Sequence, residues 1–213
     1  LLFIVFSAFV VYGILLFIHV ILKRVFCTKK PKWKNLDYVP EVTLFVAAYT
    51  ERDYIDAKVK NSFSLEYPAE KVKHVWVTDG SNDGTPDLLR TYEGIEVHHL
   101  DARGGKIGAM NRGMQFVKTP IVIFSDGNTM LGHESIRRII NLFSDPKVGC
   151  VSGEKRIFGK ETDAAAGAGE GLYWKYESTL KKWDAELYSV VGAAGELFAI
   201  RTELFQEVEK DTL

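Results

Sequence analysis

Cysteine is scarce in this sequence, and the two residues present, Cys27 and Cys150, lie far apart. Two thiols at that separation imply neither a disulfide framework nor a zinc site. Only 6 residues are proline and 46% are hydrophobic, which excludes a disordered chain. The 18 glycines show no three-residue period, which excludes collagen. The chain of 213 residues can therefore bury the core of one sizeable domain.

Charge is absent from the first 22 residues, where only His19 and a few small polar groups interrupt an apolar run. This length predicts a transmembrane helix over residues 1–22. A signal peptide is the alternative, but its apolar region is only about 7–15 residues long and follows its basic cluster. Here six Lys or Arg residues come after the run, in a basic juxtamembrane linker over residues 23–40. That order predicts a membrane protein whose following domain lies on the cytoplasmic side.

The remainder of the chain has an excess of acidic residues. Residues 35–213 keep all 28 Asp and Glu but only 21 of the 27 Lys and Arg, which gives a formal charge of −7. Nucleic-acid-binding domains carry basic surfaces, so an acidic domain argues against a nucleic-acid partner.

Apolar β-rich segments alternate with segments of helical period from residue 41 onward, so we expect one domain over residues 41–213. Such alternation predicts an α/β fold with a mainly parallel sheet and helices on both faces. Strands are expected at 42–48, 72–79, 95–100, 120–126 and 148–157. Helices are expected from about 50 to 63, at 85–92, at 106–117, around 136–143 and at 172–187. Thr50 with Asp53 resembles a capping box, and Thr85 resembles an N-cap before Pro86.

Polar residues follow three of the expected strands, and ligands of parallel sheets bind at those carboxyl ends. The segment from Asp79 to Gly84 could accept hydrogen bonds from a base or ribose, and a plain turn is the alternative. Asp126-Gly127-Asn128 offers oxygen atoms suited to a divalent cation shared with a diphosphate. The basic, glycine-rich segment 103–106 at a helix start suggests phosphate binding, although it matches neither a P-loop nor a dinucleotide fingerprint.

Taken in order, these segments resemble the nucleotide-sugar-binding domain of family-2 inverting glycosyltransferases. The Gly105-Lys106 to Asn111 stretch looks like the family's G-K-x-x-A-x-N element, and Asp126-Gly127-Asn128 occupies the place of its D-x-D motif, with Asn128 as a departure. The resemblance runs from about Pro40 to Leu213 and is strongest to membrane-bound synthases of chitin, hyaluronan, cellulose and poly-N-acetylglucosamine. It implies the GT-A fold, a Rossmann-like α/β sheet, preceded here by one transmembrane helix.

The resemblance also implies roles for individual residues. Mg²⁺ or Mn²⁺ would be held by Asp126 and Asn128, and Lys106 would lie near the diphosphate. Residues expected to bind the donor are Tyr49, Glu51, Asp79, Ser81, Asp83, Lys106, Asn111 and Asp126. Residues expected on the acceptor side are Gly195, Glu196 and Trp174, although an aromatic residue in a helical stripe more often belongs to a core.

The implied activity is metal-dependent, inverting transfer of a sugar from a nucleotide-sugar donor, a UDP-sugar, to a polysaccharide or glycolipid acceptor at the membrane. The family's catalytic base lies in a T/S-[ED]-D-type motif that would begin about where this chain ends. We therefore expect no catalytic base before Leu213 and a domain that binds donor but is incomplete at its C-terminus.

Two other functions stay open at this point. A membrane-anchored nucleotide-sugar-binding protein without transferase activity would keep the same donor residues. A nucleotidyltransferase would need a basic, glycine-rich loop after the first strand, where this chain has Ala47-Ala48-Tyr49-Thr50-Glu51 instead.

Overall fold

The structure is a computed structural model, and it describes residues 7–26, 37–154, 166–190 and 192–209. Its helices are α2 (Tyr12–Phe26), α3 (Arg52–Phe63), α4 (Thr85–Arg90), α5 (Gly105–Met114), α6 (Ser135–Phe143) and α7 (Ala166–Leu187). Its strands are β1 (Val42–Ala48), β2 (Val72–Asp79), β3 (Ile95–Leu100), β4 (Ile121–Asp126), β5 (Cys150–Ser152) and β6 (Leu197–Arg201). Short helical turns lie at η1 (Ser7–Val11), η2 (Ala69–Lys71) and η4 (Thr202–Leu204). The chain divides into two compact units, one of residues 1–32 and 154–193 and one of residues 33–153 and 194–213.

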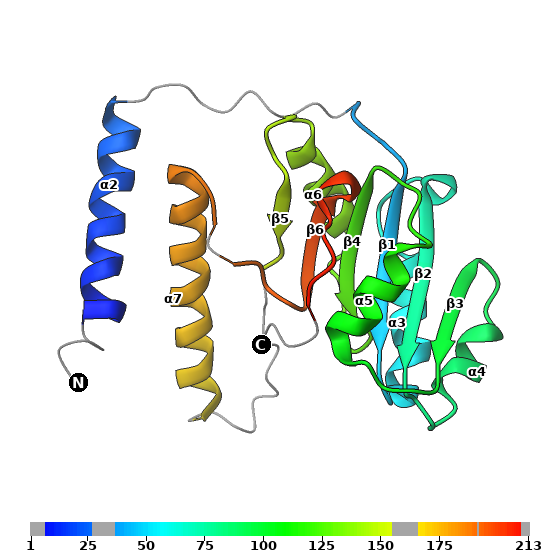
Figure 1. Cartoon of the computed structure of the whole chain (residues 1–213). Helices are drawn as coiled ribbons and strands as arrows, with labels where there is room; N and C mark the ends of the chain where they lie inside the picture. Colours follow the sequence, from blue (N-terminus) through cyan, green and yellow to red (C-terminus); the bar gives the residue numbers. More distant parts are fainter. Residues whose placement is uncertain (1–6, 27–36, 155–165, 191, 210–213) are drawn as a thin grey trace. The chain divides into compact units, whose positions relative to one another are not determined.

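The second unit contains one mixed sheet with the strand order β3-β2-β1-β4-β6-β5 (Figure 1). Strands β3, β2, β1 and β4 are parallel, while β6 runs antiparallel to both β4 and β5. The α/β prediction is confirmed. The sequence analysis did not predict β6, whose partners β4 and β5 are set by tertiary pairing.

Alternate residues of β1 enter two separate cores, as the period of two in a strand requires. Leu44 and Val46 pack with Ile55 of α3 and Ile140 of α6 on one face of the sheet. Phe45 packs with Ala109 of α5 on the other face. Helices therefore cover both faces of the sheet, with α5 on one side and α3 on the other (Figure 1).

Most expected elements lie within a few residues of their predicted positions, but both predicted caps are wrong. Helix α3 has Glu51 at its N-cap and no side-chain capping bond, so Thr50 and Asp53 form no capping box. Helix α4 is capped by Gly84, whose φ of 82° is a left-handed conformation that glycine adopts without strain. The predicted strand over 148–157 is seen at Cys150–Ser152, and residues 155–157 lie outside the described residues.

The first unit contains α2 and α7, and the predicted helix over 172–187 is confirmed. The rings of Phe17 and Trp183 lie 5.3 Å apart, and Arg24 forms a two-bond ion pair with Glu186. No helix within residues 7–26, 37–154, 166–190 and 192–209 is both long and apolar enough to cross a membrane. The first six residues of the predicted span and residues 27–36 of the predicted linker lie outside the described residues.

Candidate donor and metal site

The parallel strands β1, β2 and β4 end at the same edge of the sheet. Ala47 of β1 is in register with Asp126 of β4, and Ala48 is in register with Thr78, the residue before Asp79. The loops that follow these strands therefore come together, as the sequence predicts. Two groups of polar residues lie there: the β2-end cluster of Asp79, Ser81 and Asp83, and the β4-end cluster of Glu51, Lys58, Lys106 and Asp126.

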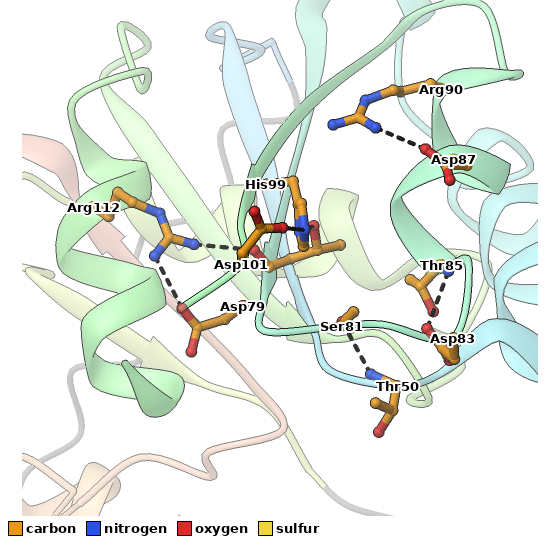
Figure 2. A network of polar contacts seen from close by, with 11 residues as sticks. Thr50, Asp79, Ser81, Asp83, Thr85, Asp87, Arg90, His99, Asp101 and Arg112 are labelled. Carbon is orange, nitrogen blue, oxygen red and sulfur yellow. Dashed lines mark hydrogen bonds and ion pairs between the residues drawn. The ribbon is translucent and has the colours of Figure 1, made fainter. Parts of the chain in front are cut away.

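Asp79 is buried, with 4% of its surface exposed, and both of its carboxylate oxygens accept hydrogen bonds from the protein. Arg112 Nη1 donates to Oδ1 at 2.9 Å (Figure 2). Gly104 N–H donates to Oδ2 at 2.7 Å. Arg112 also donates to the carbonyl of Thr78. Asp79 thus ties the end of β2 to the beginning and the last turn of α5.

Ser81 and Asp83 hold the loops after β1 and β2 together. The N–H of Thr50 donates to Ser81 Oγ at 3.1 Å (Figure 2). Asp83 accepts from the N–H groups of Arg52 and Thr85, one on each oxygen, both at 3.1 Å. Thr50 has a φ of 50°, which a β-branched residue rarely adopts, so these bonds fix the chain in an unusual conformation.

Tyr49 is exposed at the start of the same loop, and the guanidinium of Arg103 lies 3.9 Å from the centre of its ring. A cation at that distance over an aromatic face is attracted by the ring. The pair links the loop after β1 to the residues before α5 and leaves an aromatic surface open to solvent.

In the β4-end cluster, Lys106 Nζ donates to Asp126 Oδ1 and, at 2.8 Å, to the carbonyl oxygen of Gly195. The N–H of Asp126 faces the carbonyl of Glu196 at 3.4 Å. Gly195 and Glu196 therefore lie beside Lys106 and Asp126. The structure places these four residues together.

Glu51 has a buried oxygen, Oε2, for which no described residue supplies a hydrogen-bond partner. Burial raises the pKa of Glu51 from 4.5 to about 7, and the negative charge of Asp126 adds to the rise. A Cβ atom at position 127 would collide with this oxygen unless the Glu51 side chain shifted. A carboxyl group in such surroundings is typical of functional sites.

Lys58 is fully buried, and the sequence analysis did not single it out. Burial lowers the pKa of Lys58 from 10.5 to about 8, while Asp126 and Glu51 oppose that fall. Its position could have been found, because residues 55, 58, 59 and 62 form the buried i, i+3, i+4, i+7 stripe of α3.

Three other expected residues are not among the four residues of this cluster. Asn111 exchanges two hydrogen bonds with the backbone of Val208, at 2.7 and 3.2 Å, so its amide faces the C-terminal segment. Asn128 is exposed in the turn after β4. Trp174 lies in α7, which belongs to the first unit.

The oxygen donors at the end of β4 suit a hard divalent cation. Asp126 and Asn128 present side-chain oxygens two residues apart, and the unpaired oxygen of Glu51 lies beside the glycine between them. Within the described part of the chain, no three His, Cys, Asp or Glu side chains form a metal centre by themselves. Mg²⁺ commonly binds through one or two carboxylates together with phosphate and water, so these residues fit such an ion.

Comparisons with known proteins were made on this sequence and fold. The model of the family "Glycosyl transferase family 2" matches residues 43–209. A beta-monoglucosyldiacylglycerol synthase of Nostoc sp. (strain PCC 7120) is 30% identical over 169 residues, which are 75% of this chain and 34% of that protein. A poly-beta-1,6-N-acetyl-D-glucosamine synthase of Staphylococcus aureus (strain MSSA476) is 31% identical over 138 residues, which are 63% of this chain and 33% of that protein. The chain thus spans about a third of the length of these curated relatives.

Among solved structures, a mannosyltransferase from Pyrobaculum calidifontis, determined in complex with GDP-Man and Mn²⁺, has a similar fold. The TM-score is 0.76 at 23% sequence identity, and the match covers 93% of this chain and 54% of that chain. The likeness shows a common fold.

Proposed function

The chain belongs to glycosyl transferase family 2, with a GT-A-like fold, and from that premise we propose that it transfers a sugar from a UDP-sugar to a polysaccharide or glycolipid acceptor with inversion. The names of the two curated relatives, one a glycolipid synthase and one a polysaccharide synthase, support this acceptor class.

The observation that carries the proposal is the meeting of Glu51, Lys106 and Asp126 at the carboxyl ends of parallel strands. Two carboxylates and a lysine on this edge provide binding groups for a cation and for a diphosphate. The exposed ring of Tyr49 and the loop over Ser81 and Asp83 adjoin them and supply a surface for the nucleoside.

In the proposed reaction, an acceptor hydroxyl oxygen forms a bond to the anomeric carbon while the bond from that carbon to the diphosphate oxygen breaks. The hydroxyl proton passes to a base, a role that we assign to no described residue. Asp126 and Asn128 would hold Mg²⁺ or Mn²⁺, which neutralises negative charge on a leaving diphosphate. Lys106 would exchange its bond to Asp126 for one to a phosphate oxygen and so stabilise the same charge.

We further propose that residues 1–22 anchor the domain at the cytoplasmic face of a membrane. Apart from the buried residues Gly13, Leu16 and Val20, most of α2 is apolar and exposed. The exposed side chains include Ile14, Leu15, Phe17, Ile18, Ile21, Leu22, Val25 and Phe26. A surface of this kind favours contact with lipid. Cell fractionation tests this: the chain should stay with membranes through an alkaline wash that releases peripheral proteins, and its release would contradict anchoring.

Calorimetric titration of the chain with UDP, with Mn²⁺ or Mg²⁺ and then with EDTA, tests the donor site. We expect binding that tightens when the metal is present. Binding of UDP that does not respond to metal would contradict metal dependence, and absence of binding to UDP and GDP alike would contradict the donor site. As a control, the variant Lys118→Met changes an exposed residue outside both clusters and should bind UDP as the wild type does.

A further inference from the structure

Two polar side chains on the buried side of α3 contact the loop that follows β4. Lys58 has no exposed surface, and its Nζ donates to Ser125 Oγ at 2.7 Å and to the carbonyl oxygen of Thr129. Ser125 comes directly before Asp126, and Thr129 directly after Asn128. A single ammonium group therefore bridges the two ends of the turn that carries the expected metal ligands.

Asn61 continues this contact one helical turn further along α3. Its Nδ2 donates to the carbonyl of Leu131 at 2.8 Å, and its Oδ1 accepts from the N–H of Leu131, also at 2.8 Å. Both the nitrogen and the oxygen of the amide thus bond to the backbone of one residue. Because positions three apart share a face of a helix, Lys58 and Asn61 act on the same loop.

The turn is also restrained by hydrogen bonds of its own backbone. Gly127 N–H donates to the carbonyl of Ala47 at 3.0 Å, and Thr129 N–H donates to the carbonyl of Asp126 at 3.2 Å. The side chain of Asp126 is held by Lys106, a group that the proposed function assigns to the diphosphate. Once Lys106 turns to a phosphate, the side-chain bonds from α3 remain, together with these backbone bonds, to hold the turn in place.

We infer that Lys58 and Asn61 are positioning residues that fix the Asp126–Asn128 turn, so that Asp126 is presented to a divalent cation bound with a nucleotide diphosphate. The inference rests on the proposed function for the identity of the ligand. It assigns neither residue to contact with donor or acceptor. Both would act through the turn.

A purely structural role explains Lys58 poorly. Taking an ammonium group out of water is unfavourable, and replacing a whole buried ion pair by apolar side chains of similar volume is often neutral or stabilising. The depressed pKa of Lys58 agrees with such a penalty. The presence of a buried lysine at position 58 therefore points to a role for its hydrogen bonds to Ser125 and Thr129.

The test compares Lys58→Met and Asn61→Leu with Val59→Ala in the 213-residue chain. Val59 is equally buried on the same helix and packs only in the apolar core, so its substitution reports a loss of packing alone. The first readout is amide exchange of Gly127, Thr129 and Leu131 in EDTA, each relative to Ile123 in β4. The second is the dissociation constant of UDP measured with Mn²⁺ and with EDTA.

We expect faster exchange of the loop amides relative to Ile123 in Lys58→Met and Asn61→Leu, and unchanged ratios in Val59→Ala. Substitution of groups that orient a metal ligand typically weakens metal affinity by about 10–100-fold. The UDP dissociation constant in Mn²⁺ should therefore rise by at least about tenfold in Lys58→Met, while the constant in EDTA stays within about twofold. Melting of Lys58→Met at or above the temperature of Val59→Ala would separate this effect from a loss of stability.

Loop amides as protected in both variants as in the wild type would overturn the inference, as would an unchanged dissociation constant in Mn²⁺. Failure of the wild-type chain to bind UDP would instead contradict the proposed function. In that case the exchange rates still decide whether Lys58 and Asn61 fix the turn.

Discussion

The β2-end and β4-end clusters lie at one edge of the same sheet but differ in how their carboxylates are paired. In the β2-end cluster, both oxygens of Asp79 and both of Asp83 accept hydrogen bonds from neighbouring loops. In the β4-end cluster, one oxygen of Glu51 is buried without a partner among the described residues, and the pKa of Glu51 is raised to about 7. The first arrangement stabilises the folded loops, and the second keeps groups available for a ligand at some expense of stability.

The largest effect that this comparison predicts is on stability, at Asp79. Asp79→Ala would leave Arg112, whose side chain is 21% exposed, without its carboxylate and would leave the Gly104 N–H unpaired. We expect the free energy of unfolding to fall by about 3 kcal/mol, as when one partner of a largely buried pair is removed. Urea denaturation measures it. A loss below about 1 kcal/mol, the usual value of an exposed pair, would mean that Asp79 is not a scaffold residue.

The second prediction concerns the contact between Gly127 and Glu51. In Gly127→Ala the new methyl group would collide with Glu51 Oε2 and lie 3.1 Å from Ala48 Cβ. Overpacking of this kind typically lowers the free energy of unfolding by about 1–3 kcal/mol. The double variant Gly127→Ala/Glu51→Ala should recover part of that loss in the same denaturation experiment. Strictly additive losses would show that the two residues do not interact.

The third prediction separates binding from stability at Asp126. Its ion pair with Lys106 is partly exposed, with 25% and 43% of the two side chains accessible. Asp126→Asn should therefore change the free energy of unfolding by less than about 1 kcal/mol. Calorimetry should show UDP affinity in Mn²⁺ weakened by at least about tenfold, because an amide is a weaker ligand for a hard cation than a carboxylate. Full retention of metal-dependent affinity would remove Asp126 from the cation site.

The smallest predicted effect is the pH dependence that Glu51 imposes. The pKa of Glu51 is raised in the folded chain from 4.5 to about 7, so between these values the folded state binds more protons than the unfolded state. Stability from this group is therefore fully present below about pH 4.5 and is lost as the pH rises to about 7.

Glu51→Gln should remove that slope. We expect wild-type stability to fall relative to the variant by about 1 kcal/mol over this interval, allowing for solvent screening of a half-buried group. Denaturation curves at several pH values measure the difference. Parallel stability profiles for the two proteins would show that Glu51 titrates normally.

Periodicity and strand-end polarity were sufficient to predict where the candidate site lies. Asp79 and Asp126 follow apolar strands, and parallel strands bring their carboxyl ends to one edge. These signals could not predict which side chains pair with one another. Nothing in the sequence shows that Arg112 of α5 pairs with Asp79. Nor does it show that Asn111 bonds to the backbone of Val208. The antiparallel β6 was also missed, because its partners are set by tertiary pairing.

Lys58 shows the limit of assigning charged residues to the surface. The stripe of Ile55, Val59 and Ser62 places Lys58 on the buried side of α3, but the low frequency of buried lysines argued the other way. The rule that charged residues lie at the surface fails where the hydrogen bonds of a buried polar group serve a functional site.

The central claim is that Glu51, Lys106 and Asp126 of the β4-end cluster bind a nucleotide diphosphate together with a divalent cation. Its most direct test is the unfolding free energy of the wild type and Asp126→Asn with UDP and Mn²⁺, and with UDP and EDTA. A ligand at 100 times its dissociation constant stabilises the folded state by about 2.7 kcal/mol. The account predicts a gain of that order for the wild type with Mn²⁺ and a much smaller gain for Asp126→Asn. Equal gains in the two proteins, or a wild-type gain that EDTA leaves unchanged, would contradict it.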